Sequence, residues 1–154
     1  MIQIRNSLFE TNSSSVNTLV IPKDASISIP ERVSLFYDNY SSWRYTEDTD
    51  TLDYAYSMCV DRGDCEILLF LNYLRRKGVK EIETHPTTGI EEWDIDYDDS
   101  AIPLKDIFGS EKVLDLFCFG SGSMIYEGND NDSDNLYKFS KNSYDLNKFY
   151  IIER

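Results

Sequence analysis

Residues 10–15, with the sequence ETNSSS, concentrate carboxylate, amide and hydroxyl groups between two apolar segments. In an active site a carboxylate transfers protons, while amide and hydroxyl groups hydrogen-bond a ligand. Asn, Ser and Thr side chains also bond to nearby backbone in Asx and ST turns. In the structural interpretation, the run reverses the chain between two strands, and Glu10 pairs with Arg5. In the functional interpretation, Glu10, Asn12 and residues 13–15 form a polar pocket that binds a partner or a phosphate-bearing ligand. If that pocket is catalytic, Glu10 is the general base and Asn12 and Ser14 lie beside it. The sequence leaves both interpretations open.

His85 is the single histidine of the chain, and Pro86 follows it. Because there is no second histidine, a metal site built from several histidines is excluded, and no cysteine lies near His85 in sequence. A histidine that acts as a general base needs a nucleophile or carboxylate within hydrogen-bond reach. Glu83 is the nearest carboxylate in sequence, which makes His85 a further candidate if the protein is an enzyme acting on RNA or a nucleotide.

Acidic residues gather in three short windows, residues 47–53, 91–99 and 127–134, which hold 14 of the 28. Like charges placed this close together repel one another and lower stability, so the clustering of these residues needs an explanation. Three interpretations are open: a solvated face, a mimic of nucleic-acid phosphates that enters a basic groove, and a Mg²⁺ site. A metal site needs convergent carboxylates, whereas a strand spreads them apart. We therefore expect no metal and no cofactor.

The central window, residues 91–99, has the sequence EEWDIDYDD. Its alternation predicts a strand that turns Trp93, Ile95 and Tyr97 toward the core. The aspartates on the outer face would then follow one another at about 6.6 Å, which is two strand rises. We expect this row to contact a partner, together with the third window. The candidate partner-binding residues are Glu91, Glu92, Asp94, Asp96, Asp98, Asp99, Asp130, Asp132 and Asp134.

Two other motifs lack residues that a specific site requires. The segment 120–123, GSGS, has neither the Lys-Ser/Thr of a P-loop nor the third glycine of a dinucleotide fingerprint, so it predicts a tight connection between a helix and a strand. The run 130–134 begins like a calcium loop. However, Asn135 replaces the turn glycine, and Lys141 stands where the closing glutamate belongs, which favours a solvated loop.

The composition narrows the classes of partner. A net charge of -13 argues against direct binding to duplex DNA, because nucleic-acid-binding proteins cluster Lys and Arg, but it suits a partner with a basic groove. Cys59, Cys65 and Cys118 are expected to be free and mostly buried. No apolar run reaches the length of a membrane span, and the N-terminus lacks a signal-peptide pattern. We therefore expect a cytoplasmic protein.

The elements that position these residues predict an α+β fold in a single domain, residues 1–154. A mostly antiparallel sheet is packed by one long core helix, residues 65–77, and by shorter helices. Asp64 is the expected N-cap of the core helix, and Gly78 is the expected left-handed residue after its end. Three or four strands are predicted over the segments 1–9, 16–21, 25–29 and 32–37, and further strands at 79–84, 91–99, 124–126, 136–139 and 148–152. A shorter helix is predicted at 51–59, and one or two more over 103–108 and 110–119.

The N-terminal run 4–15, IRNSLFETNSSS, resembles a signature of small phage and mobile-element proteins, some of which are similar to anti-CRISPR inhibitors of Cas9. The segment 128–132, GNDND, is a weaker match to the same group. The resemblance implies an inhibitor that binds a host nucleic-acid enzyme, such as a Cas9–guide RNA complex. A histidine commonly follows the serines in that signature; here the position holds Asn17, which does not titrate and cannot act as a proton carrier.

Overall fold

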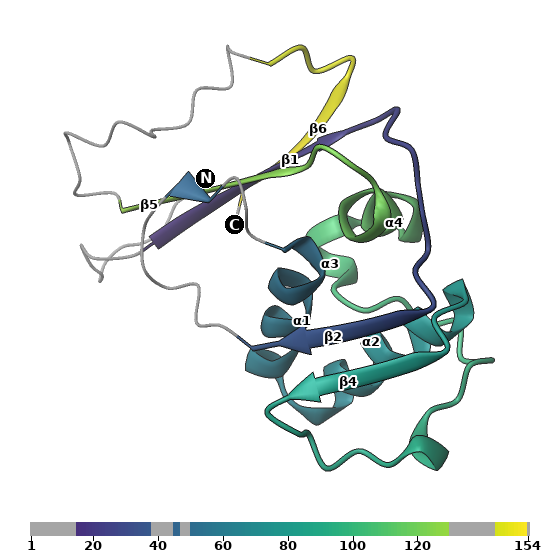
Figure 1. Cartoon of the computed structure of the whole chain (residues 1–154). Coiled ribbons are helices and arrows are strands. Elements are labelled where there is room, and N and C mark those ends of the chain that lie inside the picture. Colours follow the sequence, from purple (N-terminus) through teal and green to yellow (C-terminus); the bar gives the residue numbers. More distant parts are fainter. Residues whose placement is uncertain (1–14, 38–44, 47–49, 130–143, 154) are drawn as a thin grey trace.

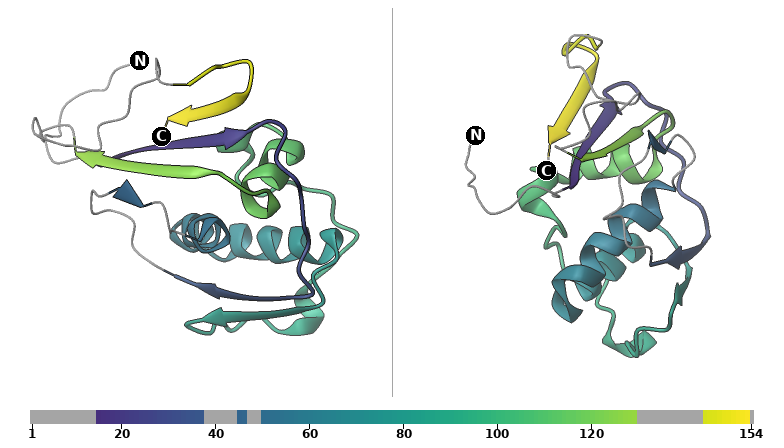
Figure 2. Two further views of the ribbon diagram at one scale, coloured as in Figure 1. Left: turned by 45° about the horizontal axis from the view of Figure 1, so that its top comes forward. Right: turned by 90° about the vertical axis from the view of Figure 1, so that its left-hand side faces the viewer.

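The computed structural model describes residues 15–37, 45–46, 50–129 and 144–153, and these form three layers. A four-stranded sheet, a layer of helices and a two-stranded ribbon lie one above the other (Figure 2). The α+β prediction is confirmed. The predicted strands at 1–9 and 136–139, the run 10–14 and the acidic residues 130–134 lie outside the described residues.

The four-stranded sheet is antiparallel throughout, in the order β3-β5-β1-β6. β1 (Ser15–Pro22) is a central strand; Leu19 lies opposite Ile125 on one side and Ile152 on the other. Leu19, Ile21 and Ile125 are buried against the helices. The other strands are β3 (Tyr45–Thr46), β5 (Met124–Asn129) and β6 (Phe149–Glu153).

Two helices of similar length, α1 (Thr51–Arg62) and α2 (Asp64–Lys77), pack together in the middle layer. The Asp50 side chain caps α1 by accepting hydrogen bonds from the amides of Leu52 and Asp53. Gly63 alone joins the helices, at φ 115°. The predicted N-cap at Asp64 is wrong by one residue, because Asp64 is already helical and Gly63 precedes it. Gly78 has the predicted left-handed conformation.

Two shorter helices complete the layer, α3 (Lys105–Phe108) and α4 (Glu111–Phe119). The Ser110 hydroxyl caps α4 by accepting from the amide of Val113 at 3.3 Å. Arg62 holds α3 to the end of α1 through two hydrogen bonds to the Asp106 carboxylate, at 2.6 and 2.8 Å. Both short helices were predicted, and the four residues 120–123 make the expected tight connection from α4 to β5.

β2 (Arg32–Phe36) and β4 (Glu81–His85) form a parallel ribbon on the other side of the helices (Figure 1). Val33 and Leu35 turn inward and are buried in the core. The amide of Phe36 donates to the Asp53 carboxylate of α1 at 3.0 Å, which ties the ribbon to the helices. The ribbon is the parallel exception in a mostly antiparallel fold.

The core is rich in aromatic side chains. Tyr54, Tyr56, Tyr73, Phe70 and Phe117 are all fully buried. The rings of Tyr73 and Phe70 lie 6.0 Å apart, as do those of Tyr54 and Phe117. Burial of this area supplies the apolar driving force that a chain of this charge needs to fold.

The three cysteines are free, as expected. Cys59 and Cys118 are buried, whereas Cys65 is exposed at the start of α2. Burial raises the pKa of the Cys59 and Cys118 thiols, because the charged thiolate is poorly solvated in the core. Both side chains therefore act as small apolar residues in the core.

The predicted strand at 25–29 is wrong. The segment makes a single antiparallel bridge, between Ile27 and Gly120, and Ile27 is exposed. It is an extended connection that crosses from β1 to β2, and the Ser28 amide donates to the Phe119 carbonyl at 3.1 Å. Pro22 and Pro30 bound the segment and lack the amide protons that a longer ladder requires.

Candidate partner-binding surface

Residues 91–99, here called the acidic arm, do not form the predicted strand. They begin with the short 3₁₀ helix η1 (Glu92–Asp94), and a turn follows in which the Asp99 amide donates to the Asp96 carbonyl at 3.2 Å. The arm pairs with no strand in the described part of the chain. The prediction of a row of aspartates at strand spacing is therefore wrong, and the carboxylates are distributed around a compact turn.

The carboxylates of the arm fix its own backbone. The Glu91 amide donates to the Asp94 carboxylate at 3.0 Å, and the Glu91 carboxylate accepts from the Asp94 amide, which completes a capping box. The Asp98 amide donates to Asp96 Oδ1 at 3.0 Å, and the Ala101 amide donates to Asp99 Oδ1 at 2.9 Å. Acidic side chains often form such local turns, and here these bonds prevail over the alternating pattern.

Two aromatic side chains of the arm point to solvent. Trp93 is 81% exposed and Tyr97 is 55% exposed, whereas Ile95 is half-buried and packs against the core. The prediction that all three residues face the core is therefore wrong for both aromatic rings. Trp and Tyr are the residue types most enriched at the energetic centres of protein interfaces. Their exposure here suits a surface that another protein covers.

Three residues on one face of α2 hold the arm in place. Asn72, which is buried, accepts from the Asp96 amide at 2.6 Å. Arg75, whose side chain is only 10% exposed, donates to the Lys80 carbonyl and to the Glu92 carboxylate. Arg76 donates to the Asp99 carbonyl. Positions i, i+3 and i+4 of a helix lie side by side, so these residues form one continuous mount.

These anchors were not predicted from the sequence. The basic residues 75–77 lie in the last turn of α2 and complement the negative end of the helix dipole, which accounts for their charge but not for their partners. The available signal was the spacing of Asn72, Arg75 and Arg76, which places three polar groups on one face of a helix whose remaining faces are largely apolar. Such a stripe on a core helix indicates polar contacts with another part of the chain.

The basic end of α2 is also neutralised by α4. Arg76 and Lys77 bind the Glu111 carboxylate at 2.6 and 2.7 Å, and Lys77 also binds Asp115 at 2.8 Å. The hydroxyl of Tyr73 donates to Asp115 at 2.7 Å. Among the described residues, only Arg75 forms a salt bridge with a carboxylate of the arm. The arm therefore carries a strong net negative charge.

The Glu111 ion pairs give a prediction for acid stability. Burial alone would raise the pKa of Glu111, but the hydrogen bonds and charges of Lys77 and Arg76 together outweigh it and hold the pKa below its ordinary value. Folding thus favours the ionised form. We expect its stabilising contribution to be present above the ordinary value of 4.5 and lost as the pH falls through the lower pKa of the folded state.

Urea unfolding of the wild type and of Glu111→Gln, followed from neutral to acid pH, measures this contribution. The difference in free energy of unfolding between the two proteins should shrink as the solution becomes acidic. Glu81→Gln, which removes an exposed partner of Arg32, is the matched control and should show little change. Parallel curves for wild type and Glu111→Gln would contradict the assignment.

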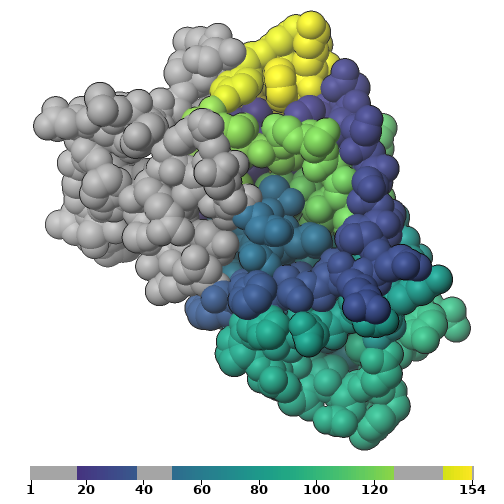
Figure 3. Space-filling view, in the orientation of Figure 1, coloured from purple at the N-terminus to yellow at the C-terminus, as the bar shows by residue number. Residues whose placement is uncertain are grey.

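The arm encloses a shallow concavity of about 420 Å³. The arm lies at the end of the molecule opposite the four-stranded sheet, below β4 in Figure 1, and this end forms the lower surface in Figure 3. The residues that line the concavity are Glu92, Trp93, Ile95, Asp96, Tyr97 and Asp98. Aromatic rings and carboxylates therefore share one depression.

His85 lies at the end of β4, on the ribbon. Its ring stacks on Phe36, with ring centroids 4.4 Å apart and planes inclined by 10°, and its Nε2 lies 3.7 Å from a Glu83 carboxylate oxygen. The other candidate catalytic residues, Glu10, Asn12 and Ser14, lie outside the described residues. The catalytic grouping therefore stays a prediction.

Asn17, at the position where the signature that the N-terminal run resembles commonly has histidine, is a buried residue of β1. Its side-chain amide donates to the Tyr54 hydroxyl at 2.6 Å, while its Oδ1 has no hydrogen-bond partner in the described part of the chain. The bond joins β1 to α1 across the core. In this chain, the side chain at position 17 thus links a strand to a helix.

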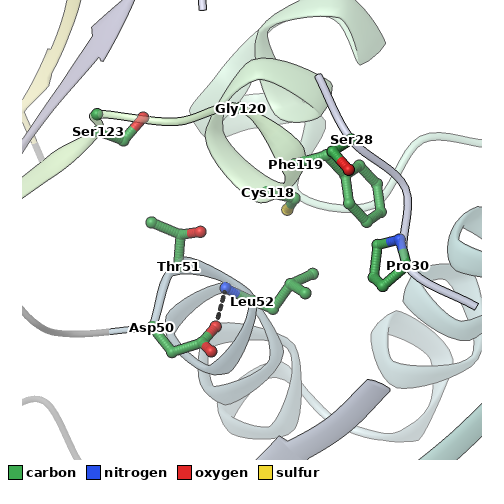
Figure 4. Close-up of a pocket in the computed structure, with 10 residues that line it drawn as sticks. Ser28, Pro30, Asp50, Thr51, Leu52, Cys118, Phe119, Gly120 and Ser123 are labelled. Carbon is green, nitrogen blue, oxygen red and sulfur yellow. Dashed lines mark hydrogen bonds between the residues drawn. The ribbon is translucent and has the colours of Figure 1, made fainter. Parts of the chain in front are cut away.

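A second depression, of about 410 Å³, lies between the start of α1 and the end of α4 (Figure 4). Asp50 and Thr51 line one side, and Cys118 and Ser123 line others. The Asp50 carboxylate already accepts from the first amides of α1, and burial keeps the Cys118 thiol neutral by raising its pKa. These groups offer no cation to bind an acidic ligand, so we assign none.

Within the described ranges, no three His, Cys, Asp or Glu side chains are grouped so that they could hold a metal ion. No helix in those ranges is both long and apolar enough to cross a bilayer. Comparisons with protein-family models, curated sequences and solved structures give no match. Function is therefore inferred from the chemistry of the described surface.

Proposed function

We propose that the protein binds a basic, nucleic-acid-handling protein through the acidic arm and inhibits it. The observation that carries the proposal is the exposure of Trp93 and Tyr97 among carboxylates that are mounted on a core helix. Aromatic anchors supply affinity when a partner buries them, and surrounding charges steer the encounter and select the partner. A rigid mount lowers the entropy lost on binding.

The resemblance of the N-terminal run names the candidate partner class. In the small phage and mobile-element proteins that share the signature, some members are similar to inhibitors of Cas9, and such an effector holds nucleic acid in a positively charged channel. An arm with six carboxylates, at residues 91–99, has the charge that enters such a channel. A Cas9–guide RNA complex in a bacterial host cell is therefore the first partner to test.

The compact shape of the arm changes how we expect it to mimic nucleic-acid phosphates. Carboxylates around a compact turn do not reproduce the regular spacing of a phosphate backbone, so binding is expected to combine apolar burial with charge. Salt weakens attraction between exposed charges but not apolar burial. We therefore expect high salt to reduce the affinity without abolishing it.

The test is affinity capture from a bacterial lysate at low and high salt, followed by binding measurements with the purified partner. The double variant Asp96→Asn/Asp98→Asn removes two charges, and asparagine keeps the side-chain oxygen that accepts from the Asp98 amide. We expect about a tenfold loss of affinity, because two charges that attract a basic partner are removed.

A matched control removes the same charge elsewhere. Glu31→Gln/Glu81→Gln changes two exposed carboxylates that pair with Lys80 and Arg32 near the ribbon. This variant should retain the partner as the wild type does. Retention of the partner by Asp96→Asn/Asp98→Asn with unchanged affinity would count decisively against the arm as the binding surface.

A further inference from the structure

We propose that the concavity of the acidic arm receives an arginine side chain of the partner. The inference rests on the proposed function and deepens it, because it specifies the chemical group that the surface recognises. It depends on two separate features of one depression: carboxylates that attract a cation and aromatic rings that remain exposed. The proposed occupant is the guanidinium of an arginine on the partner protein. A lysine ammonium is the alternative, and the test below distinguishes the two.

The aromatic rings provide the first argument. Trp93 is the most exposed large hydrophobic side chain in the described part of the chain, and it lines the same depression as Tyr97. Ile95 lies between them in sequence and packs inward against the core, so it supports the floor. A guanidinium is planar and weakly hydrated, and it stacks on aromatic faces better than an ammonium does.

The carboxylates provide the second argument. Asp96 uses Oδ1 to accept from the Asp98 amide, which leaves its other oxygen for a ligand, and the Asp98 carboxylate accepts no hydrogen bond from a described residue. Glu92 shows the pairing within the protein itself, since Arg75 binds its carboxylate. A guanidinium donates from several N–H groups in a fixed fork, which suits two neighbouring carboxylates.

The rigidity of the depression provides the third argument. The backbone on both sides of Ile95 is fixed, by the capping box at Glu91 and Asp94 and by the bond from the Asp96 amide to Asn72. A site that is ordered before binding does not lose further backbone entropy when the ligand arrives.

The experiment observes Trp93 directly by NMR. The chain has two tryptophans, so the indole N–H signal of Trp93 is identified by its loss in Trp93→Phe. Glycine peptides that differ only in a central arginine, lysine or citrulline are titrated into the full chain. We expect the arginine peptide to shift the Trp93 signal and to bind about tenfold more tightly than the lysine peptide, with no binding of the uncharged citrulline peptide.

Variants separate the contribution of the aromatic rings from that of the carboxylates. Tyr97→Ala and Asp98→Asn should each weaken the arginine peptide by about threefold to tenfold, and Glu31→Gln should not. Equal affinities for arginine and lysine peptides, or no shift with any peptide, would overturn the guanidinium assignment. The proposed function fails separately, when Asp96→Asn/Asp98→Asn captures the partner as well as the wild type does.

Discussion

Gly120→Ala is expected to lower the free energy of unfolding by about 3 kcal/mol, and the melting temperature by roughly 6 to 12 °C. A Cβ atom at this position would lie 2.4 Å from the Leu116 carbonyl oxygen and 2.9 Å from the Ala25 Cβ. The first contact is with backbone that accepts the last hydrogen bond of α4, from the Gly120 amide. Relief of the clash therefore requires the end of α4 or the 25–29 segment to shift.

Urea unfolding followed by circular dichroism measures the effect. Gly89→Ala is the matched control, because Gly89 has φ +84° and no atom within 4 Å of the added Cβ. That substitution carries only the strain of a left-handed conformation, about 1 kcal/mol. Gly120 has φ -86°, so its cost comes from space and not from backbone conformation. If the two variants lost equal stability, close packing at Gly120 would not be the cause.

The close contact at Gly120 also explains how the layers are joined. Gly120 ends α4, begins the connection to β5, and pairs with Ile27 on the segment that leads from β1 to β2. Three chain segments thus meet where a side chain has no room. A sequence of Gly and Ser identifies a connection of this kind, but the need for glycine at one position comes from segments distant in sequence.

Elements with strong local signals were predicted well. α2 begins after Gly63 and ends at Gly78, and its acidic and basic residues match the helix dipole at each end. β1 is a run rich in β-branched residues that ends at Pro22, and β2 is a short run of alternating burial that follows Pro30. The parallel pairing of β2 with β4 was not predicted, because the two strands are separated by both central helices, and local sequence carries no signal for their direction.

The acidic arm shows where pattern and local chemistry conflict. Alternation of acidic and apolar residues predicted a strand, but acidic side chains also cap turns, and the arm has a capping box and two further bonds of this type. Of the three apolar residues, only Ile95 packs on the core. Residues 91–99 were thus recognised from the sequence as an acidic segment, while the geometry of the segment and its exposed rings were not predicted. Its role in binding stays a prediction.

Arg75→Met is expected to lower the free energy of unfolding by about 2 kcal/mol and to release the arm from α2. The guanidinium, almost fully buried, donates to the Lys80 carbonyl and the Glu92 carboxylate, and methionine keeps much of the apolar stem. Arg75 Nε is buried without a partner, so its removal offsets part of the loss. Hydrogen exchange should accelerate in residues 91–99 more than in the rest of α2.

Glu92→Gln separates the anchor from the ion pair. Glu92 is 68% exposed, and pairs with such exposed carboxylates contribute at most about 1 kcal/mol, so this variant should keep nearly the full stability. If Arg75→Met and Glu92→Gln lose equal stability, the hydrogen bond from Arg75 to the Lys80 carbonyl contributes nothing to holding the arm. If Arg75→Met weakens partner binding while Glu92→Gln does not, affinity depends on the position of Trp93 and Tyr97. A rigid mount for two exposed rings is what distinguishes a binding surface from a solvated acidic turn.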